Sequence, residues 1–123
     1  MVPSSAGSVV MVPFPFSDLS QTKLRPAVVL AGAGRGDWVL CQITSNPYAD
    51  TRAVLLENSD FGSGSLRVAS YARPGKLFTA NNSLIASEIG ILKVDALERV
   101  LEAVVTLLQP KTLGSTAASS ATS

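Results

Sequence analysis

Up to Thr79 the chain repeats one pattern, in which short apolar runs are separated by polar segments rich in glycine and proline. Each run is four to seven residues long and rich in β-branched or aromatic side chains, which is typical of a strand and too short for a helix. Strands at this spacing, with no alternation of strand and helix, favour a small twisted β-barrel. The predicted strands are Val9–Phe14, Pro26–Ala31, Trp38–Thr44, Ala53–Leu56, Leu66–Tyr71 and Lys76–Thr79.

Glycine and proline define the boundaries between these runs. Pro13 and Pro15 lack the backbone N–H that a sheet requires, so the first strand must end or lie at a sheet edge there. Ser59–Ser65 holds two glycines and an aspartate and predicts a turn. Pro74-Gly75 is predicted to divide the last two strands.

A helical periodicity replaces the strand pattern after residue 94 and predicts a helix over Asp95–Leu108, which Pro110 ends. Asp95 with Glu98 three residues later predicts a capping box at its start. The apolar residues at helical spacing are predicted to face the barrel core, with a partner surface as the alternative. They are Leu97, Val100, Leu101, Val104 and Leu108.

Length and composition favour one domain over residues 1–110, followed by a disordered tail over residues 111–123. The chain has 123 residues, 46% of them hydrophobic, while its last residues are mostly Ser, Thr and Ala. No stretch approaches the ~20 apolar residues of a membrane span, and the first residues lack the features of a signal peptide. We therefore expect a cytoplasmic protein that does not bind membranes.

The residue inventory restricts the chemistry. The chain has no histidine and one cysteine, so zinc and iron–sulfur sites lack ligands, and we expect no cofactor. Cys41 lies in an apolar strand and is interpreted as a small core residue rather than a nucleophile. The net charge of +1 predicts no general basic surface for nucleic acid.

Two strand ends carry the candidate chemistry. Arg25 opens the second predicted strand, and Thr44 with Ser45 ends the third. One guanidinium and two hydroxyls beside a polar loop suit a phosphodiester, because the planar donors of arginine match phosphate oxygens. The alternative is that Arg25 is a surface charge and Thr44 only a residue that favours strands.

Several motifs in the same order resemble the MazF/PemK family of toxin endoribonucleases. The resemblance implies an SH3-like β-barrel of the MazF/PemK/CcdB type with a C-terminal helix. It further implies a homodimeric toxin of a type II toxin–antitoxin system that inhibits growth by cutting single-stranded mRNA at specific short sequences without metal. A cognate antitoxin would hold it inactive and would provide its only link to DNA. The motifs are FPFSDLSQTK (14–23), RPAVVL (25–30), QITSNPY (42–48), DFGSGSL (60–66), SYARPGKLFT (70–79) and a helix after IGIL (89–92).

The resemblance also implies roles for particular residues. Arg25 and Thr44 match positions regarded as catalytic, and Ser45 is adjacent. Attack by the 2′-OH of the RNA would leave a 2′,3′-cyclic phosphate and a 5′-OH, through a phosphorane that such donors stabilise. Phe16 and Tyr48 are candidates for stacking on bases, with core packing as the alternative.

The remaining RNA-binding candidates are charged residues. Lys23, Arg73 and Lys76 are assigned to phosphate contacts, and Asp18 is a candidate base or a turn residue. The chain departs from the family where an R-T-I-D run is replaced by the residues 78–81, FTAN. Lys76 is the first candidate to supply the missing charge, Arg73 and Arg67 are the others, and the alternative is that each is a solvated surface charge. The alternative function is a non-catalytic SH3-like module that binds RNA or a peptide. The motifs leave open the RNA sequence that is cleaved, the antitoxin and the proton-transfer groups.

Overall fold

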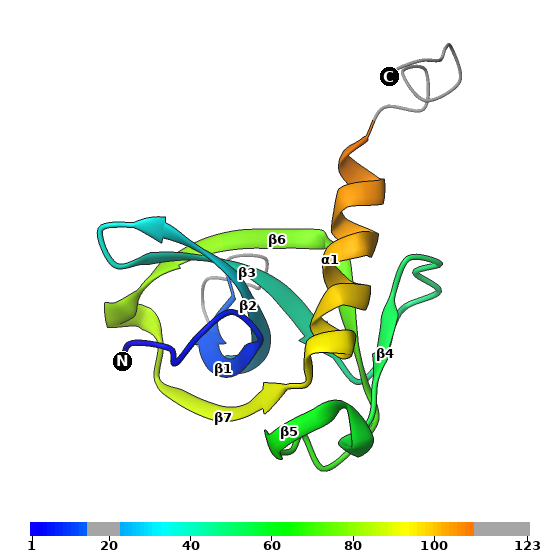
Figure 1. Cartoon of the computed structure of the whole chain (residues 1–123), viewed down its shortest axis with the longest axis horizontal. Coiled ribbons are helices and arrows are strands. Elements are labelled where there is room, and N and C mark those ends of the chain that lie inside the picture. The colour runs from blue at the N-terminus through cyan, green and yellow to red at the C-terminus, as the bar shows by residue number, and fades with distance from the viewer. Residues whose placement is uncertain (15–22, 110–123) are drawn as a thin grey trace.

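The computed structural model describes residues 1–14 and 23–109, which form a strongly curled antiparallel sheet and one helix (Figure 1). Seven strands follow the order β4-β6-β3-β2-β1-β7-β5 across the sheet. The predicted mainly β fold with a C-terminal helix is confirmed. The elements are β1 (Ser8–Pro13), β2 (Leu24–Gly34), β3 (Asp37–Thr44), β4 (Val54–Leu56), η1 (Asn58–Asp60), β5 (Phe61–Gly64), β6 (Ser70–Asn81), η2 (Asn82–Leu84), β7 (Ser87–Leu92) and α1 (Val94–Leu108).

Helix α1 covers the side of the curl where the sheet's two edge strands lie. It packs against β4 and β6, and its Arg99 pairs with Asp60, directly before β5, at 2.9 Å. The buried face of the helix belongs to the same core cluster as residues of both edge strands, Leu56 in β4 and Phe61 in β5. Burial of these apolar side chains is the main force holding the curl closed. The buried residues of the helix are Ala96, Val100 and Val104.

The predicted apolar face of α1 is confirmed except at its end. Leu97 and Leu101 are partly buried and pack against the core, but Leu108 is 66% exposed. The predicted capping box is wrong. The N-cap is Lys93, whose side chain makes no capping bond, and the chain enters the helix directly from β7. Asp95 therefore lies in the first turn, where its charge still suits the helix dipole.

Strand β6 runs without a break through the position where two strands were expected. Cys41 on β3 pairs with Leu77, while Ile43 pairs with Ala72, so residues 73–76 of β6 lie opposite the single residue Gln42. This is a large bulge, and it accommodates the Pro-Gly pair inside one strand. The predicted division is therefore wrong. The turn predicted at 59–65 contains the end of η1 and β5 instead.

Residues of β3 alternate between two core clusters on the two faces of the sheet. Cys41 and Ile43 belong to the cluster beneath α1, and Leu40 belongs to the opposite one, which also contains Phe14. Cys41 is fully buried, as predicted, and its thiol donates to the carbonyl of Arg73 at 3.2 Å. Burial raises the pKa of this thiol to about 12, so it stays protonated and inert.

Within the described residues, no helix has the length and apolar content needed to cross a membrane. The predicted tail, 111–123, and the predicted domain boundary at residue 110 lie outside these residues.

Candidate functional site

The sheet face opposite α1 changes from apolar to polar where β2 begins and β3 ends. Ala27 on β2 pairs with Gln42 on β3, and the residues around them in the ladder are largely buried. Arg25 lies two residues before Ala27 on β2, and Thr44 lies two residues after Gln42 on β3, so both are on the same face of the sheet as this pair. The antiparallel register therefore brings the start of one strand and the end of the next to a common point.

These side chains line a pocket of ≈ 440 Å³, here called the Arg25 pocket. Its apolar walls include Phe14, Leu66 and Val68. Arg25 is its only charged lining residue within the described chain, so the pocket carries positive charge without a carboxylate to neutralise it. The polar lining residues are Arg25, Gln42, Thr44, Ser45, Tyr48 and Ser70.

The Thr44 hydroxyl is oriented by the chain that follows it. Its Oγ1 accepts the backbone N–H of Asn46 at 3.2 Å. A hydroxyl that accepts one bond still has its own proton, so Thr44 remains able to donate a hydrogen bond. Ser45 is exposed and adds a second hydroxyl at the same strand end.

Tyr48 is presented by a tight turn after β3. The Asn46 side chain accepts the Tyr48 N–H at 2.9 Å, and both Tyr48 and Ala49 adopt left-handed backbone conformations, with φ of 53° and 60°. Residues other than glycine rarely adopt this conformation, and such strain is concentrated at binding and catalytic sites. The result is an aromatic side chain that is 66% exposed and lines the pocket.

Arg73 lies against this aromatic residue. Its Nε pairs with Asp50 Oδ2 at 3.1 Å, and its guanidinium lies 5.5 Å from the centre of the Tyr48 ring. The backbone N–H of Arg52, and then the side chain of Arg73, lower the pKa of Asp50, which therefore remains ionised. An ionised Asp50 fixes Arg73, and Arg73 in turn supports the ring through a cation–π contact.

The structure brings together only part of the site expected from sequence. Arg25, Thr44, Ser45 and Tyr48 line one pocket. Two aromatic or acidic candidates from the first loop, Phe16 and Asp18, lie outside the described residues.

The three other cationic candidates lie elsewhere. Lys23 is exposed directly before β2, and neither it nor Arg73 or Lys76 is among the residues that line the pocket. Arg73 is instead engaged with Asp50 and Tyr48.

Gln42 is the residue that sequence reasoning missed. Its Oε1 is buried and accepts no hydrogen bond from the residues that the structure describes. The signal available in the sequence was a polar residue two positions before Thr44, in a strand whose remaining residues are mostly apolar.

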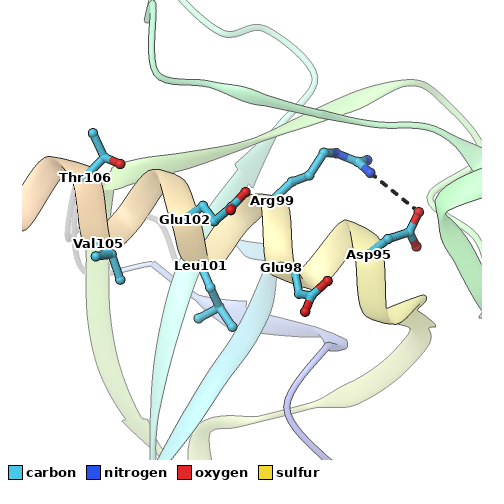
Figure 2. A pocket seen from close by; sticks show the side chains of 7 residues that line it. All are labelled: Asp95, Glu98, Arg99, Leu101, Glu102, Val105 and Thr106. Atoms are coloured by element: carbon cyan, nitrogen blue, oxygen red, sulfur yellow. Dashed lines mark ion pairs between the residues drawn. The ribbon is translucent and has the colours of Figure 1, made fainter.

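A second hollow, of ≈ 860 Å³, runs along the outer side of α1 and is here called the α1 hollow (Figure 2). Three carboxylates and one guanidinium line it, and Arg99 is committed to Asp60 at 2.9 Å and Asp95 at 3.9 Å. This excess of negative charge disfavours a phosphate ligand. Of these two hollows, the Arg25 pocket is therefore the better candidate site for a phosphate.

Solved structures with this architecture include bacterial toxins. MazF from Deinococcus radiodurans is 25% identical, with a TM-score of 0.67 over 88% of this chain and 97% of that chain. In the MazE–MazF complex from the same organism the values are 25%, 0.67, 88% and 96%. An endoribonuclease from a mycobacterial species, solved with its cognate antitoxin, is 14% identical with a TM-score of 0.65, over 88% and 95% of the two chains, a likeness of fold alone.

No curated protein sequence matches the chain. Residues 5–108 match a family model described as "PemK-like, MazF-like toxin of type II toxin-antitoxin system". This match includes every described element, and the predicted MazF/PemK-type fold is confirmed. The chain therefore belongs to the PemK-like, MazF-like toxin family of type II toxin–antitoxin systems.

Proposed function

We propose that this toxin is an endoribonuclease that cleaves single-stranded mRNA at short specific sequences without metal, and that the Arg25 pocket is its active site. The observation that carries the proposal is the meeting of Arg25, Thr44 and Ser45 in one pocket whose described lining contains no carboxylate. Family membership and the endoribonuclease among the structural neighbours support the activity.

The pocket suits transesterification by the substrate's own 2′-OH. The 2′-oxygen forms a bond to the adjacent phosphorus and loses its proton, while the bond to the 5′-oxygen of the next nucleotide breaks and that oxygen gains a proton. The products are a 2′,3′-cyclic phosphate and a 5′-OH. Because the chain contains no histidine, these protons must move through other side chains or water.

Each proposed catalytic group has a defined task in this reaction. The Arg25 guanidinium stabilises the extra negative charge of the phosphorane, and its planar donors fit two phosphate oxygens. The Thr44 hydroxyl, whose oxygen already accepts the Asn46 N–H, donates a hydrogen bond to an oxygen of the phosphorane and keeps its proton. Ser45 supplies a further donor at the same strand end.

We further propose that the toxin is a homodimer that a cognate antitoxin inhibits. Structures of a MazE–MazF complex and of an endoribonuclease with its cognate antitoxin, both with this fold, support the second point. An acidic antitoxin segment would compete with RNA for Arg25, since carboxylates and phosphates use the same donors.

The deciding experiment uses one RNA that the protein cleaves and a copy with hydrogen in place of the 2′-OH at the scissile nucleotide. We expect the copy to bind with similar affinity but to resist cleavage. The RNA products should carry a cyclic phosphate and a 5′-OH, and cleavage should persist in EDTA. Cleavage of the deoxy copy would contradict the mechanism. Binding of RNA with no cleavage of any sequence would favour the alternative, a non-catalytic binding module.

A further inference from the structure

The turn that follows Thr44 has a strained backbone. Tyr48 and Ala49 both adopt left-handed conformations, with φ of 53° and 60°, although neither is a glycine. Such conformations persist only where the surrounding contacts hold them, and they are concentrated at functional sites. This turn begins at a proposed catalytic hydroxyl and ends at β4, so the contacts that hold it in place bear on the site.

Asp50 closes the turn through four hydrogen bonds. Its backbone N–H donates to the carbonyl of Pro47 at 2.9 Å, and its carbonyl accepts the N–H of Ala53 at 3.2 Å. In its side chain, Oδ1 accepts the N–H of Arg52 at 2.9 Å, and Oδ2 accepts Arg73 Nε at 3.1 Å. Of these four bonds, only the last reaches beyond the segment between β3 and β4. The ion pair with Arg73 therefore attaches the turn to the sheet.

Arg73 is well placed to anchor this segment. β6 lies between β3 and β4, and Ala72 pairs with both strands, so the segment that joins them must cross β6. Arg73 is the next residue of β6. Its carbonyl accepts the Cys41 thiol at 3.2 Å, while its guanidinium pairs with Asp50 and lies 5.5 Å from the centre of the Tyr48 ring. The two side chains of the ion pair are only 19% and 16% exposed, so water weakens it less than an ion pair on an open surface.

Two further hydrogen bonds connect the turn to the Thr44 hydroxyl. The N–H of Tyr48 donates to Asn46 Oδ1 at 2.9 Å, and the N–H of Asn46 donates to Thr44 Oγ1 at 3.2 Å. A donor stabilises a transition state most when it is already in place, and a displacement of about 1 Å can lower a rate about a hundredfold. A turn that is fixed on β6 therefore keeps the Thr44 hydroxyl where it is needed.

We propose that the Asp50–Arg73 ion pair fixes the turn after β3 on β6 and thereby positions the Thr44 hydroxyl for the cleavage step. Asp50 and Arg73 are positioning residues, which act through Thr44 and touch neither the RNA nor the reacting atoms. The inference rests on the proposed endoribonuclease function and adds to it the contact that makes one catalytic hydroxyl effective.

The first test is Asp50→Asn, which keeps a side-chain oxygen for the Arg52 N–H and removes the charge that holds Arg73. In cleavage kinetics with a defined RNA, we expect kcat to fall about tenfold, and by no more than in Thr44→Val. KM should change less than about twofold, because Arg25 and the pocket walls are unaltered. An unchanged kcat would overturn the inference. A rise in KM alone would also overturn it, because the pair would then serve binding rather than the cleavage step.

Asp60→Asn is the matched control, because Asp60 has a similar environment away from the Arg25 pocket. Its side chain accepts the N–H of Glu57 at 2.8 Å, pairs with Arg99 at 2.9 Å, and is likewise 16% exposed. The two variants should therefore lower the melting temperature by similar, small amounts. Only Asp50→Asn should slow cleavage. Equal slowing in both variants would assign the effect to lost stability and contradict a positioning role.

The second test asks whether Asp50 acts through Thr44. Thr44→Val has no hydroxyl left to position, so adding Asp50→Asn to it should change kcat by less than about twofold. Arg73→Gln should slow the wild-type protein about as much as Asp50→Asn does, and the two changes together no more than either alone. If Asp50→Asn slows the Thr44→Val protein as much as the wild type, Asp50 does not act through this hydroxyl and the inference fails.

The outcomes separate the two proposals. A wild-type protein that cleaves no RNA overturns the proposed function, and the positioning role with it. A wild-type protein that cleaves RNA, and that keeps its kcat after Asp50→Asn, overturns the positioning role alone.

Discussion

The Arg25 pocket and the α1 hollow differ in a way that size does not reveal. The α1 hollow is about twice as large, ≈ 860 Å³ against ≈ 440 Å³, yet its guanidinium is paired with two carboxylates. In the smaller pocket, the Arg25 guanidinium and several hydroxyls, those of Thr44 and Ser45 among them, meet an unsatisfied amide oxygen, without a lining carboxylate among the described residues. Charges that are paired within the protein stabilise the fold, whereas uncompensated donors can act on a ligand.

The backbone is also regular at the α1 hollow and irregular at the Arg25 pocket. Helix α1 is one continuous α-helix over Val94–Leu108. The pocket lies beside a bulge of β6, opposite Gln42, and a turn with left-handed residues at Tyr48 and Ala49. Regular elements bury apolar surface well, while irregular ones aim side chains at a ligand, and both kinds occur here in one small protein.

The largest expected effect is the loss of RNA cleavage in Arg25→Ala, which Arg99→Ala should not share. Arg25→Ala should lower kcat/KM for RNA about a hundred- to a thousandfold, since removal of one donor from a transition-state oxyanion typically costs this much. Its melting temperature should hardly change, because the residue is exposed at the start of a strand. Cleavage kinetics with a defined RNA and thermal unfolding measure the two effects.

Two controls accompany this variant. Arg35→Ala changes the same residue type at the other end of β2 and should leave cleavage within about twofold of the wild-type rate. Arg99→Ala, in the α1 hollow, should do the same. Full activity in Arg25→Ala would exclude the pocket as the active site.

A smaller effect is expected for the hydroxyls. Thr44→Val keeps the branched shape that suits the end of β3 and removes only the oxygen, so it should slow kcat by about ten- to a hundredfold without unfolding the protein. Ser45→Ala should have the smaller effect of the two, since its side chain is exposed. If Ser45→Ala proves the slower enzyme under saturating RNA, the roles of the two hydroxyls must be exchanged.

The sequence predicted more about helix α1 and the fold around it than about the Arg25 pocket. Helical spacing identified the buried face of α1, because that signal depends only on local periodicity. The capping box and the division at Pro74-Gly75 were wrong, because tertiary contacts decided where the helix begins and turned the Pro-Gly pair into a bulge.

For the site, motif order identified the residues at the strand ends but not how the others are used. Arg25 and Thr44 could be paired because both belong to recognisable motifs. Arg73 contacts the Tyr48 ring and is held by Asp50, rather than lining the pocket, and this depends on contacts between segments more than twenty residues apart. The unsatisfied oxygen of Gln42 is likewise visible only in three dimensions.

The third prediction concerns stability rather than activity. The backbone N–H of Glu57, and then the side chain of Arg99, lower the pKa of Asp60. Its ionised form therefore stabilises the fold at pH above its unfolded pKa of about 3.9, and this contribution is lost as pH falls through the lower folded pKa. Arg99→Ala should reduce the free energy of unfolding by about 0.2–1 kcal/mol at pH 7, and by less near pH 3, in urea titrations. An equal loss at both pH values would contradict this pairing.

The smallest effect is expected from treating the folded protein with a thiol reagent, because Cys41 and its neighbour Gln42 on β3 lie on different faces of the sheet. Gln42 lines the Arg25 pocket, whereas Cys41 is buried in the core beneath α1, with its thiol pKa raised to about 12. A thiol reagent that enters the pocket should therefore leave Cys41 unmodified at pH 8 and should not change cleavage, because neither access nor thiolate is available. The same thiol should react fully in denaturant. Rapid labelling of the folded protein would show that the core beneath α1 opens, and that the two faces of β3 are less separate than the structure indicates.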